Sequence, residues 1–266
     1  AGNIGKPMYS KRTPLVAPTH VTEEFAEFLG YLIGDGNLHP DKNAIGFTSG
    51  DRVLIDRYAQ LVTTLFAIEP TVFWDDCTVN GEGGRWRAVF YSANVLDLLA
   101  ELEIDLRAKA PAKSIPPAIL RSPKNVVSAF LRAYFDCDGC ASAKEGVILS
   151  TFSDDIAQAL QVVLLNYGIL SRRYGVNIRI KGASARVFAD EIGFSLERKQ
   201  EKLRAYVEQR RWFTREQPFD EVVSIEHDVA DVLGRPQHRQ AVDADAALER
   251  VVVHEADRRD FGLRLA

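Results

Sequence analysis

Two aspartates in this sequence, Asp35 and Asp138, each stand directly before a glycine at the end of a mainly apolar stretch. The spacing of the apolar residues predicts that each stretch is a helix and that each aspartate lies in its last turn. A carboxylate there faces the negative end of the helix dipole and costs a few tenths to about 1 kcal/mol. Such a cost is most readily tolerated where a cation is bound. Hard carboxylate oxygens suit Mg²⁺, so the two aspartates are candidate metal ligands.

The two aspartates can act together only if their helices pack side by side. Gly30 and Gly34 are small residues inside the first helix, and Ala133 and Cys137 hold similar places in the second. Small residues of this kind let two helix backbones approach closely. The carbonyl groups at the helix ends, including those of Gly34 and Cys137, would then lie beside the carboxylates as further oxygen ligands. The glycine after each aspartate is typical of a helix that ends in a left-handed residue.

The elements around these aspartates occur twice in the chain, about a hundred residues apart. The apolar helices end in Phe28-Leu-Gly-Tyr-Leu-Ile-Gly-Asp35-Gly36 and in Leu131-Arg-Ala-Tyr-Phe-Asp-Cys-Asp138-Gly139. Each motif is followed by a polar turn, a strand and an aspartate that could cap the next helix. That helix is followed by an alternating strand region and a closing helix. We predict strands at 44–49, 71–77, 86–91, 147–151 and within 172–180, and helices at 51–66, 94–102, 154–167 and 184–192. Each copy thus has the order α-β-β-α-β-β-α, with Pro116-Pro117 at the joint.

Two copies in one chain suggest a pseudo-dimer, whose natural ligand is a nearly two-fold object such as duplex DNA. The repeat alone fits equally well a duplication that merely enlarges the core.

The two motifs resemble the paired nine-residue signatures of LAGLIDADG homing endonucleases, and the repeat covers residues 21–212. The resemblance implies an α+β fold of two pseudo-symmetric αββαββα subdomains, packed through the motif helices, with a β-saddle that binds DNA. It also implies that Asp35 and Asp138 bind Mg²⁺, with Mn²⁺ as a substitute, and that a monomer cuts both strands of a long, near-palindromic site. The preceding acid of the motif, which the family does not need for catalysis, is Ile33 in the first copy and Asp136 in the second.

The family also places one lysine beside the active site in each half. The stretch Lys113-Ser-Ile-Pro-Pro resembles the family's Lys-x-Ile-Pro segment, so Lys113 is the first candidate. In the second half the stretch from Ile192 to Gln200 resembles the closing segment, and Lys199 is the candidate, with Lys202 as the runner-up.

The strands of the family form a saddle over the major groove, which admits a two-stranded ribbon. Carried over by position, the residues expected to face DNA are Lys42, Asn43, Thr48, Arg85, Arg87, Lys144, Arg172, Arg179 and Lys181. One sequence does not fix the strand register, and alternation puts only half of each strand on one face.

The charge of the chain is unevenly distributed. The formal net charge of −4 argues against a nucleic-acid partner. Residues 171–215, however, hold twelve basic against five acidic side chains, a balance of +7, whereas residues 216–266 hold twelve acidic side chains against six arginines. The basic segment could contact phosphates, or it could be an ordinary solvated helix face.

Three cysteines, Cys77, Cys137 and Cys140, are too few for a disulfide framework and indicate a reducing compartment. Cys137 and Cys140 form one CxxC, but the nearest histidines are about a hundred residues away, so we expect structural side chains and no zinc. No apolar run is as long as a bilayer span, and we expect an intracellular, nucleoid-associated protein without a membrane partner.

The ends of the chain carry a second resemblance. The segments that begin at Phe219 and at Val251 resemble stretches that follow the endonuclease in inteins, which suggests intein ancestry. Self-splicing needs a nucleophile first and an asparagine after the late histidine, whereas the chain has Ala1 and Glu255, so we expect none. An unrelated acidic tail is the alternative.

We therefore expect an extension at 1–20, subdomains at 21–122 and 123–214, and an acidic extension at 215–266. One rival is a catalytically inactive binder on the same fold, either a regulator or an intron maturase. Another is a small-molecule enzyme with paired carboxylates, which predicts a concave apolar pocket.

Overall fold

The computed structural model describes residues 3–4, 15–16, 20–76 and 83–208. The first half of the repeat contains helices α1 (Glu23–Asp35), α2 (Arg52–Phe66) and α3 (Ala93–Glu101), and strands β3 (Gly36–His39), β4 (Ala44–Ser49), β5 (Thr71–Asp75) and β6 (Arg85–Tyr91). Two short strands, β1 (Asn3–Ile4) and β2 (Leu15–Val16), precede it, and a 3-10 turn, η1 (Pro40–Lys42), connects β3 to β4. The predicted order α-β-β-α-β-β-α is confirmed in this copy, although residues 36–39, which we expected to form a polar turn, are strand β3.

The second half contains helices α5 (Lys124–Asp138), α6 (Asp154–Leu165), α7 (Ala183–Glu191) and α8 (Glu197–Glu208), and strands β7 (Gly139–Ser142), β8 (Gly146–Ser150), β9 (Ser171–Tyr174) and β10 (Asn177–Ile180). A 3-10 turn, η2 (Ala110–Ala112), and a short helix, α4 (Pro117–Leu120), lie in the joint between the halves. The alternating region 172–180 is a hairpin of two strands, because Gly175 takes a positive φ of 57° and turns the chain. Helix α8 is an element beyond the predicted repeat.

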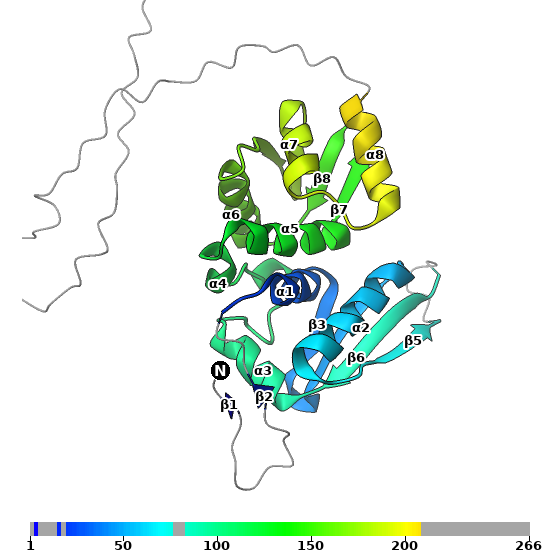
Figure 1. Ribbon diagram of the computed structural model, residues 1–266, viewed down its shortest axis with the longest axis vertical. Coiled ribbons are helices and arrows are strands. Elements are labelled where there is room, and N and C mark those ends of the chain that lie inside the picture. The colour runs from blue at the N-terminus through cyan, green and yellow to red at the C-terminus, as the bar shows by residue number, and fades with distance from the viewer. Residues whose placement is uncertain (1–2, 5–14, 17–19, 77–82, 209–266) are drawn as a thin grey trace, which may run out of the picture. The chain divides into compact units, whose positions relative to one another are not determined.

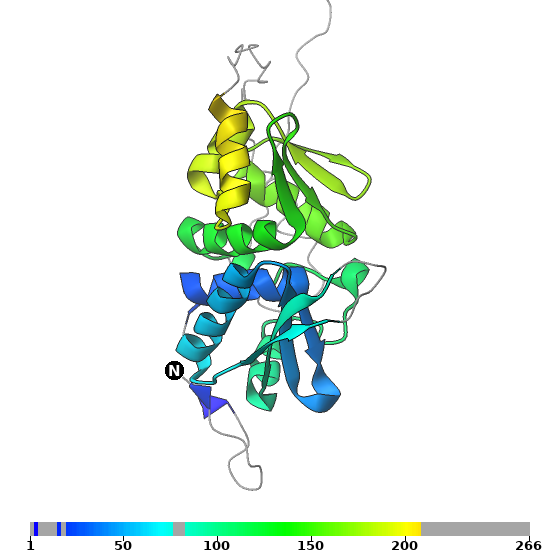
Figure 2. The ribbon, with the colours of Figure 1, turned by 90° about the vertical axis from the view of Figure 1, so that its right-hand side faces the viewer.

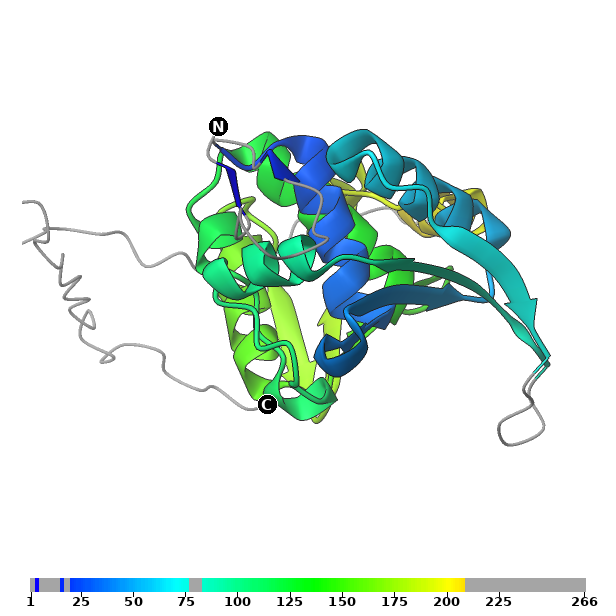
Figure 3. The ribbon, with the colours of Figure 1, turned by 90° about the horizontal axis from the view of Figure 1, so that it is seen from below.

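Each half has one antiparallel four-stranded sheet, in the order β3-β4-β6-β5 or β7-β8-β10-β9. The α+β fold class is therefore confirmed. Helices cover one face of each sheet, as Figure 3 shows for α2, which packs against β4 and β6. On that face of the first sheet the alternating side chains of Ile45, Phe47, Ala88 and Phe90 are buried, so the period of two that predicted these strands reflects one covered face.

Helices α1 and α5 lie side by side between the two halves (Figures 1 and 2). A Cβ atom at Gly30 would come within 2.4 Å of the Phe130 carbonyl oxygen, and one at Gly34 within 2.6 Å of the Cys137 Cβ atom. Side chains larger than hydrogen would therefore push the helices apart. The prediction that small residues allow the close approach is confirmed at Gly30 and Gly34.

The glycines after the two aspartates differ from the expectation. Gly36 and Gly139 are extended, with φ values of −75° and −99°, and each begins a strand directly after its helix. A left-handed residue is absent from both ends. Glycine is needed there for space, because a Cβ atom would lie 2.3 Å from the Leu32 carbonyl oxygen or 2.6 Å from that of Phe135.

The expected aspartate caps also differ. Asp51 stands at the N-cap of α2 but its side chain caps nothing, and the cap of α6 is Ser153, whose Oγ accepts a hydrogen bond from the Ile156 amide at 3.1 Å. Asp154 is instead the first helical residue of α6.

Several predictions fall outside the described residues, among them Cys77, the intein-like segments and the acidic extension. Within the described part of the chain, no helix has the length and apolar character needed to cross a membrane.

Candidate functional site

The two motif aspartates lie at the adjacent C-terminal ends of α1 and α5, where β3 and β7 begin. The packing of α1 against α5 brings them together, and the charge of Asp35 acts on Asp138. A pocket of about 580 Å³ opens beside Asp35. Its lining is polar and crosses the two halves, with Asp51 and Arg85 from one and Arg198 and Lys199 from the other. This is the opposite of the concave apolar pocket that a small-molecule enzyme would need.

Both carboxyl groups are poorly compensated in the absence of a cation. Partial desolvation, followed by the charge of Asp35, raises the pKa of Asp138 from 3.8 to about 6. Desolvation also raises the pKa of Asp35, although Lys113, Lys199 and Arg85 act against it. A cation between the carboxylates would offset the burial and the mutual repulsion together.

Each predicted lysine lies behind the end of a motif helix. The Lys113 Nζ atom donates hydrogen bonds to the carbonyl oxygens of Ile33 at 2.7 Å and Gly34 at 2.9 Å. The Lys199 Nζ atom donates to the carbonyl oxygens of Asp136 at 2.6 Å and Gly139 at 2.5 Å. Because helix C-termini carry negative partial charge, each ammonium group occupies a favourable position.

The two second-half candidates differ in environment. Lys199 is buried, whereas the runner-up Lys202 is exposed on the outer side of α8. Burial lowers the pKa of Lys199 and also that of Lys113, while the carboxylates act in the other direction. The Lys199 amine is held by three backbone carbonyl oxygens, so its environment resembles that of Lys113 and favours Lys199 over Lys202 as the second-half candidate.

Of the two predicted carbonyl ligands, Gly34 is less available than the carboxylates, because its carbonyl oxygen already accepts a hydrogen bond from Lys113 at 2.9 Å. The Cys137 carbonyl stays a predicted ligand. Among the described residues, no group of three or more His, Cys, Asp or Glu side chains could hold a metal ion. A metal here would therefore rest on the Asp35 and Asp138 carboxylates, and the oxygen donors and uncompensated charge of this pair fit a hard divalent cation.

The register of the first sheet separates its two faces. Thr48 pairs with Arg87, and Asp75 pairs with Arg85. All four lie on the face against which none of the described helices packs, and we name it the open face. Phe73 pairs with Arg87 on the same face and is 40% exposed. Of the predicted DNA-facing residues, Thr48, Arg85 and Arg87 thus lie on the open face, while Lys42 and Asn43 lie in the β3–β4 connection.

The second sheet has an equivalent open face. Arg172 pairs with Arg179, and Tyr174, which is 53% exposed, lies beside them. The Arg179 guanidinium carbon is 5.3 Å from the centre of the Tyr174 ring, a cation–π contact. Lys144 lies in the β7–β8 turn, and Lys181 follows β10 and pairs with Glu145 at 2.6 Å. Arg173 points to the helix side of the sheet, where it pairs with Asp154.

Sequence reasoning did not predict the contacts of two polar residues near Asp138, namely Asp136 and Tyr134. The Asp136 carboxylate, 2% exposed, accepts hydrogen bonds from the amides of Ser195 at 3.0 Å and Leu196 at 3.4 Å and so anchors the start of α8. Tyr134 hydrogen-bonds Asp138. The equivalent tyrosine, Tyr31, bonds Glu27 instead at 3.4 Å, so the sequence repeat did not signal this contact.

Two of the three cysteines lie in the part of the chain that the structure describes. Cys137 and Cys140 are free thiols, one half-buried against α1 and the other exposed on β7. The prediction that both are structural side chains remains a prediction.

Residues 125–193 match the protein family described as LAGLIDADG-like domain. Three named relatives share longer segments. The chain is 35% identical over 213 residues to the replication factor C small subunit of Methanocaldococcus jannaschii, 25% over 205 residues to the glutamine–fructose-6-phosphate aminotransferase of the same organism, and 29% over 212 residues to the probable translation initiation factor IF-2 of Thermococcus kodakarensis. These matches cover 75%, 72% and 78% of this chain but only 11%, 18% and 17% of the relatives.

Two solved structures share the fold. The homing endonuclease I-WcaI bound to its DNA recognition sequence aligns with a TM-score of 0.51 and 16% identity, covering 70% of this chain and 88% of that one. A mesophilic variant of the homing endonuclease I-DmoI aligns with a TM-score of 0.50 and 15% identity, covering 70% of this chain and 98% of that one.

Proposed function

Because this chain belongs to the LAGLIDADG family, we propose that it is a site-specific endonuclease that binds duplex DNA and hydrolyses one phosphodiester on each strand with a divalent cation. The observation that carries the proposal is the convergence of Asp35 and Asp138 at the paired ends of α1 and α5, each with a lysine behind the helix. An inactive binder on this fold has no need for both acids and both lysines.

The carboxylates would hold Mg²⁺, or Mn²⁺ in its place, and waters and DNA phosphates would complete the ligand set. When bound, the metal lowers the pKa of water and stabilises charge on the phosphate oxygens. The contribution of the chain is to hold Asp35 and Asp138 at a fixed separation through the rigid helix pair. Their raised pKa values mean that a cation competes with a proton for the same oxygens.

Lys113 and Lys199 would stabilise the negative charge that develops at each scissile phosphate. Their ammonium groups are fixed by carbonyl oxygens at 2.5 to 2.9 Å, so little reorganisation is needed when the charge appears. The open faces of the two sheets would contact the DNA, with Arg87 on one and Arg172 on the other. Such distributed contacts supply most of the binding energy.

The named relatives support an origin as an inserted element. A replication factor, an aminotransferase and an initiation factor bear unrelated names, yet each shares with this chain a segment that makes up a small part of its length. A segment common to unrelated proteins is best explained as an insertion that moves between genes. Intein ancestry of this chain is therefore part of the proposal.

The decisive experiment compares the wild-type protein with Asp35→Asn and Asp138→Asn on a library of randomised duplexes, with and without Mg²⁺. Asp190→Asn, an exposed aspartate on α7, is the matched control. We expect each active-site variant to lose cleavage by about three orders of magnitude or more, while DNA binding stays intact or tightens because a charge that repels phosphate is gone.

Full cleavage by either variant would show that the active site lies elsewhere. Tight, salt-sensitive duplex binding without any Mg²⁺-dependent cutting by the wild type would favour the inactive binder. A small-molecule enzyme would give no tight duplex complex at all.

A further inference from the structure

The N-cap residues of α2 and α6 stand at equivalent places in the two halves, and each contacts the lysine segment of the other half. Asp51 stands at the N-cap position of α2, and its amide donates a hydrogen bond to the Ser49 hydroxyl at 3.1 Å. Ser153 caps α6, and its amide donates to the Thr151 hydroxyl at 3.2 Å. In both halves the side chain at this position contacts the lysine segment of the other half.

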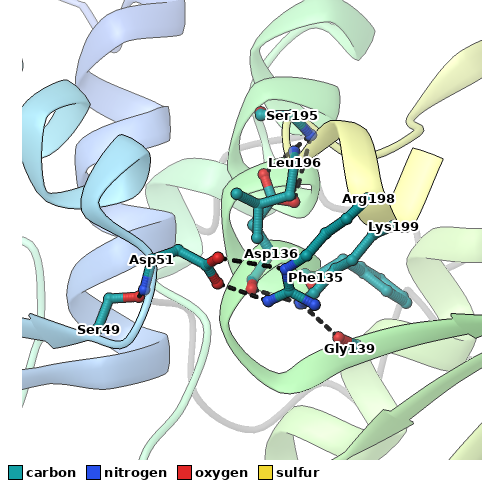
Figure 4. A network of polar contacts seen from close by, with 9 residues as sticks. All are labelled: Ser49, Asp51, Phe135, Asp136, Gly139, Ser195, Leu196, Arg198 and Lys199. Atoms are coloured by element: carbon teal, nitrogen blue, oxygen red, sulfur yellow. Dashed lines mark hydrogen bonds and ion pairs between the residues drawn. The ribbon is translucent and has the colours of Figure 1, made fainter. Parts of the chain in front are cut away.

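Figure 4 shows the first of these contacts. The Asp51 carboxylate in the first half accepts hydrogen bonds from the Arg198 guanidinium in the second half, at 2.5 Å from Nη2 and 3.2 Å from Nε. Arg198 directly precedes Lys199 at the start of α8. Because this carboxylate faces Arg198, it does not cap α2, and the stabilisation that a side-chain cap would give is lost.

The second contact runs the other way. The Ser153 hydroxyl in the second half donates a hydrogen bond of 2.5 Å to the carbonyl oxygen of Lys113 in the joint that follows the first half. The same Oγ atom accepts from the Ile156 amide and caps α6. A hydroxyl and a carbonyl group carry no charge, so this contact is neutral. Ser153 is also completely buried, so the contact is shielded from salt.

These contacts matter because the pocket beside Asp35 takes its acid from one half and its lysine, Lys199, from the other. The distance between Asp35 and Lys199 therefore depends on how the two halves are held together. We propose that Asp51 and Ser153 are positioning residues, each of which holds the lysine segment of the opposite half in register with the carboxylates. This inference rests on the proposed nuclease function and deepens it.

The two links differ in chemistry and therefore in their response to salt. The Asp51–Arg198 pair is exposed, with 57% of the Arg198 side chain and 30% of the Asp51 side chain accessible, so salt screens it. The Ser153 bond is buried and uncharged, and salt leaves it unchanged. The strand served by Lys199 should therefore lose rate as salt rises, and the strand served by Lys113 should not.

The test uses a duplex labelled on either strand, in single turnover with enzyme and Mg²⁺ in saturating excess, so that the rate reports chemistry and not binding. Asp51→Asn should slow cutting of one strand by about threefold to tenfold, and Ser153→Ala should slow the other by a similar factor. In Asp51→Asn the remaining rate on the slowed strand should no longer depend on salt.

Matched controls separate positioning from general damage. Ser92→Ala removes the cap of α3, where the Val95 amide donates to Ser92 at 3.2 Å, without a contact to the other half's lysine segment. Glu197→Gln breaks the exposed pair with Arg204 inside α8. Both controls should cut the two strands at wild-type rates.

The inference is overturned if both positioning variants slow the same strand, slow both equally, or slow neither. A readout without DNA keeps it separate from the nuclease proposal. In metal-free protein, Asp51→Asn should speed hydrogen exchange of the amides at the start of α8, near Lys199. Unchanged exchange there would refute the link even if the wild type cleaves DNA, whereas faster exchange in a protein that never cleaves would refute the nuclease proposal alone.

Discussion

Replacement of Asp138 by asparagine should make the metal-free protein more stable at neutral pH although it removes a metal ligand. The Asp138 carboxylate is half-buried beside Asp35, and desolvation and that neighbouring charge raise its pKa to about 6. Asparagine has the same shape and keeps an oxygen that accepts from Tyr134. The change therefore removes a buried charge without leaving a cavity.

The magnitude follows from the difference between the folded pKa of about 6 and the ordinary value of 3.8. A shift of roughly two units corresponds to about 3 kcal/mol, and partial solvent access and coupling to Asp35 reduce this to about 1–2 kcal/mol. Between these two pKa values the folded state binds more protons than the unfolded state, so the free energy of unfolding falls as pH rises through this window. Asp35 and Asp136, whose pKa values are also raised, act in the same direction.

Urea unfolding in the presence of a chelator, at several pH values between about 4.5 and 7.5, measures this effect. We expect the free energy of unfolding of Asp138→Asn to exceed that of the wild type most at the highest pH of this range. The difference should shrink as the pH falls. An advantage that is independent of pH, or a variant that is less stable than the wild type near neutrality, would contradict the reasoning. Excess Mg²⁺ should reverse the order, because it stabilises only the protein that retains both carboxylates.

Two further predictions concern packing and DNA contact. Gly30→Ala should lower the free energy of unfolding by about 1–3 kcal/mol, because the new Cβ atom would overlap the Phe130 carbonyl oxygen. Gly50→Ala is the control, since a Cβ atom there has nothing within 4 Å, and it should hardly change the thermal unfolding temperature. Equal losses for the two glycines would refute the close helix contact. Arg172→Ala should weaken duplex binding and reduce the slope of log affinity against log salt by about 1. Arg173→Ala is the control, because Arg173 lies on the helix side of the same strand, and it should leave this slope unchanged.

The helix pair and its acids could be predicted because their sequence pattern is a direct consequence of packing. The close contact requires glycine at positions 30 and 34, since a Cβ atom at either would meet the neighbouring helix. The strands of the first sheet could also be predicted from the alternation of apolar residues, because one face of this sheet is buried and the other is not. In β9, where none of the four residues is buried, the alternation was too weak to reveal the turn at Gly175.

The contacts between the halves could not be predicted, because they depend on residues far apart in the sequence. An aspartate before a helix predicts a cap, and Asp51 occupies that position, but its carboxylate is drawn to Arg198 by a charge that only the folded chain brings near. The open-face residues required the strand register, which pairs Thr48 with Arg87 and Arg172 with Arg179. A shift of one residue would have turned each of them toward the helices.

The two halves have diverged where the shared helix interface leaves them free to do so. Both need small residues between α1 and α5 and an acid at each helix end, and both retain them. The position two residues before the acid differs between the halves: it is Ile33 in one and Asp136 in the other. Since the Asp136 carboxylate anchors the amides at the start of α8, the second half can deliver Lys199 on a helix. The first half, with an apolar side chain there, delivers Lys113 on the connecting segment and depends on Ser153 of the other half to hold it.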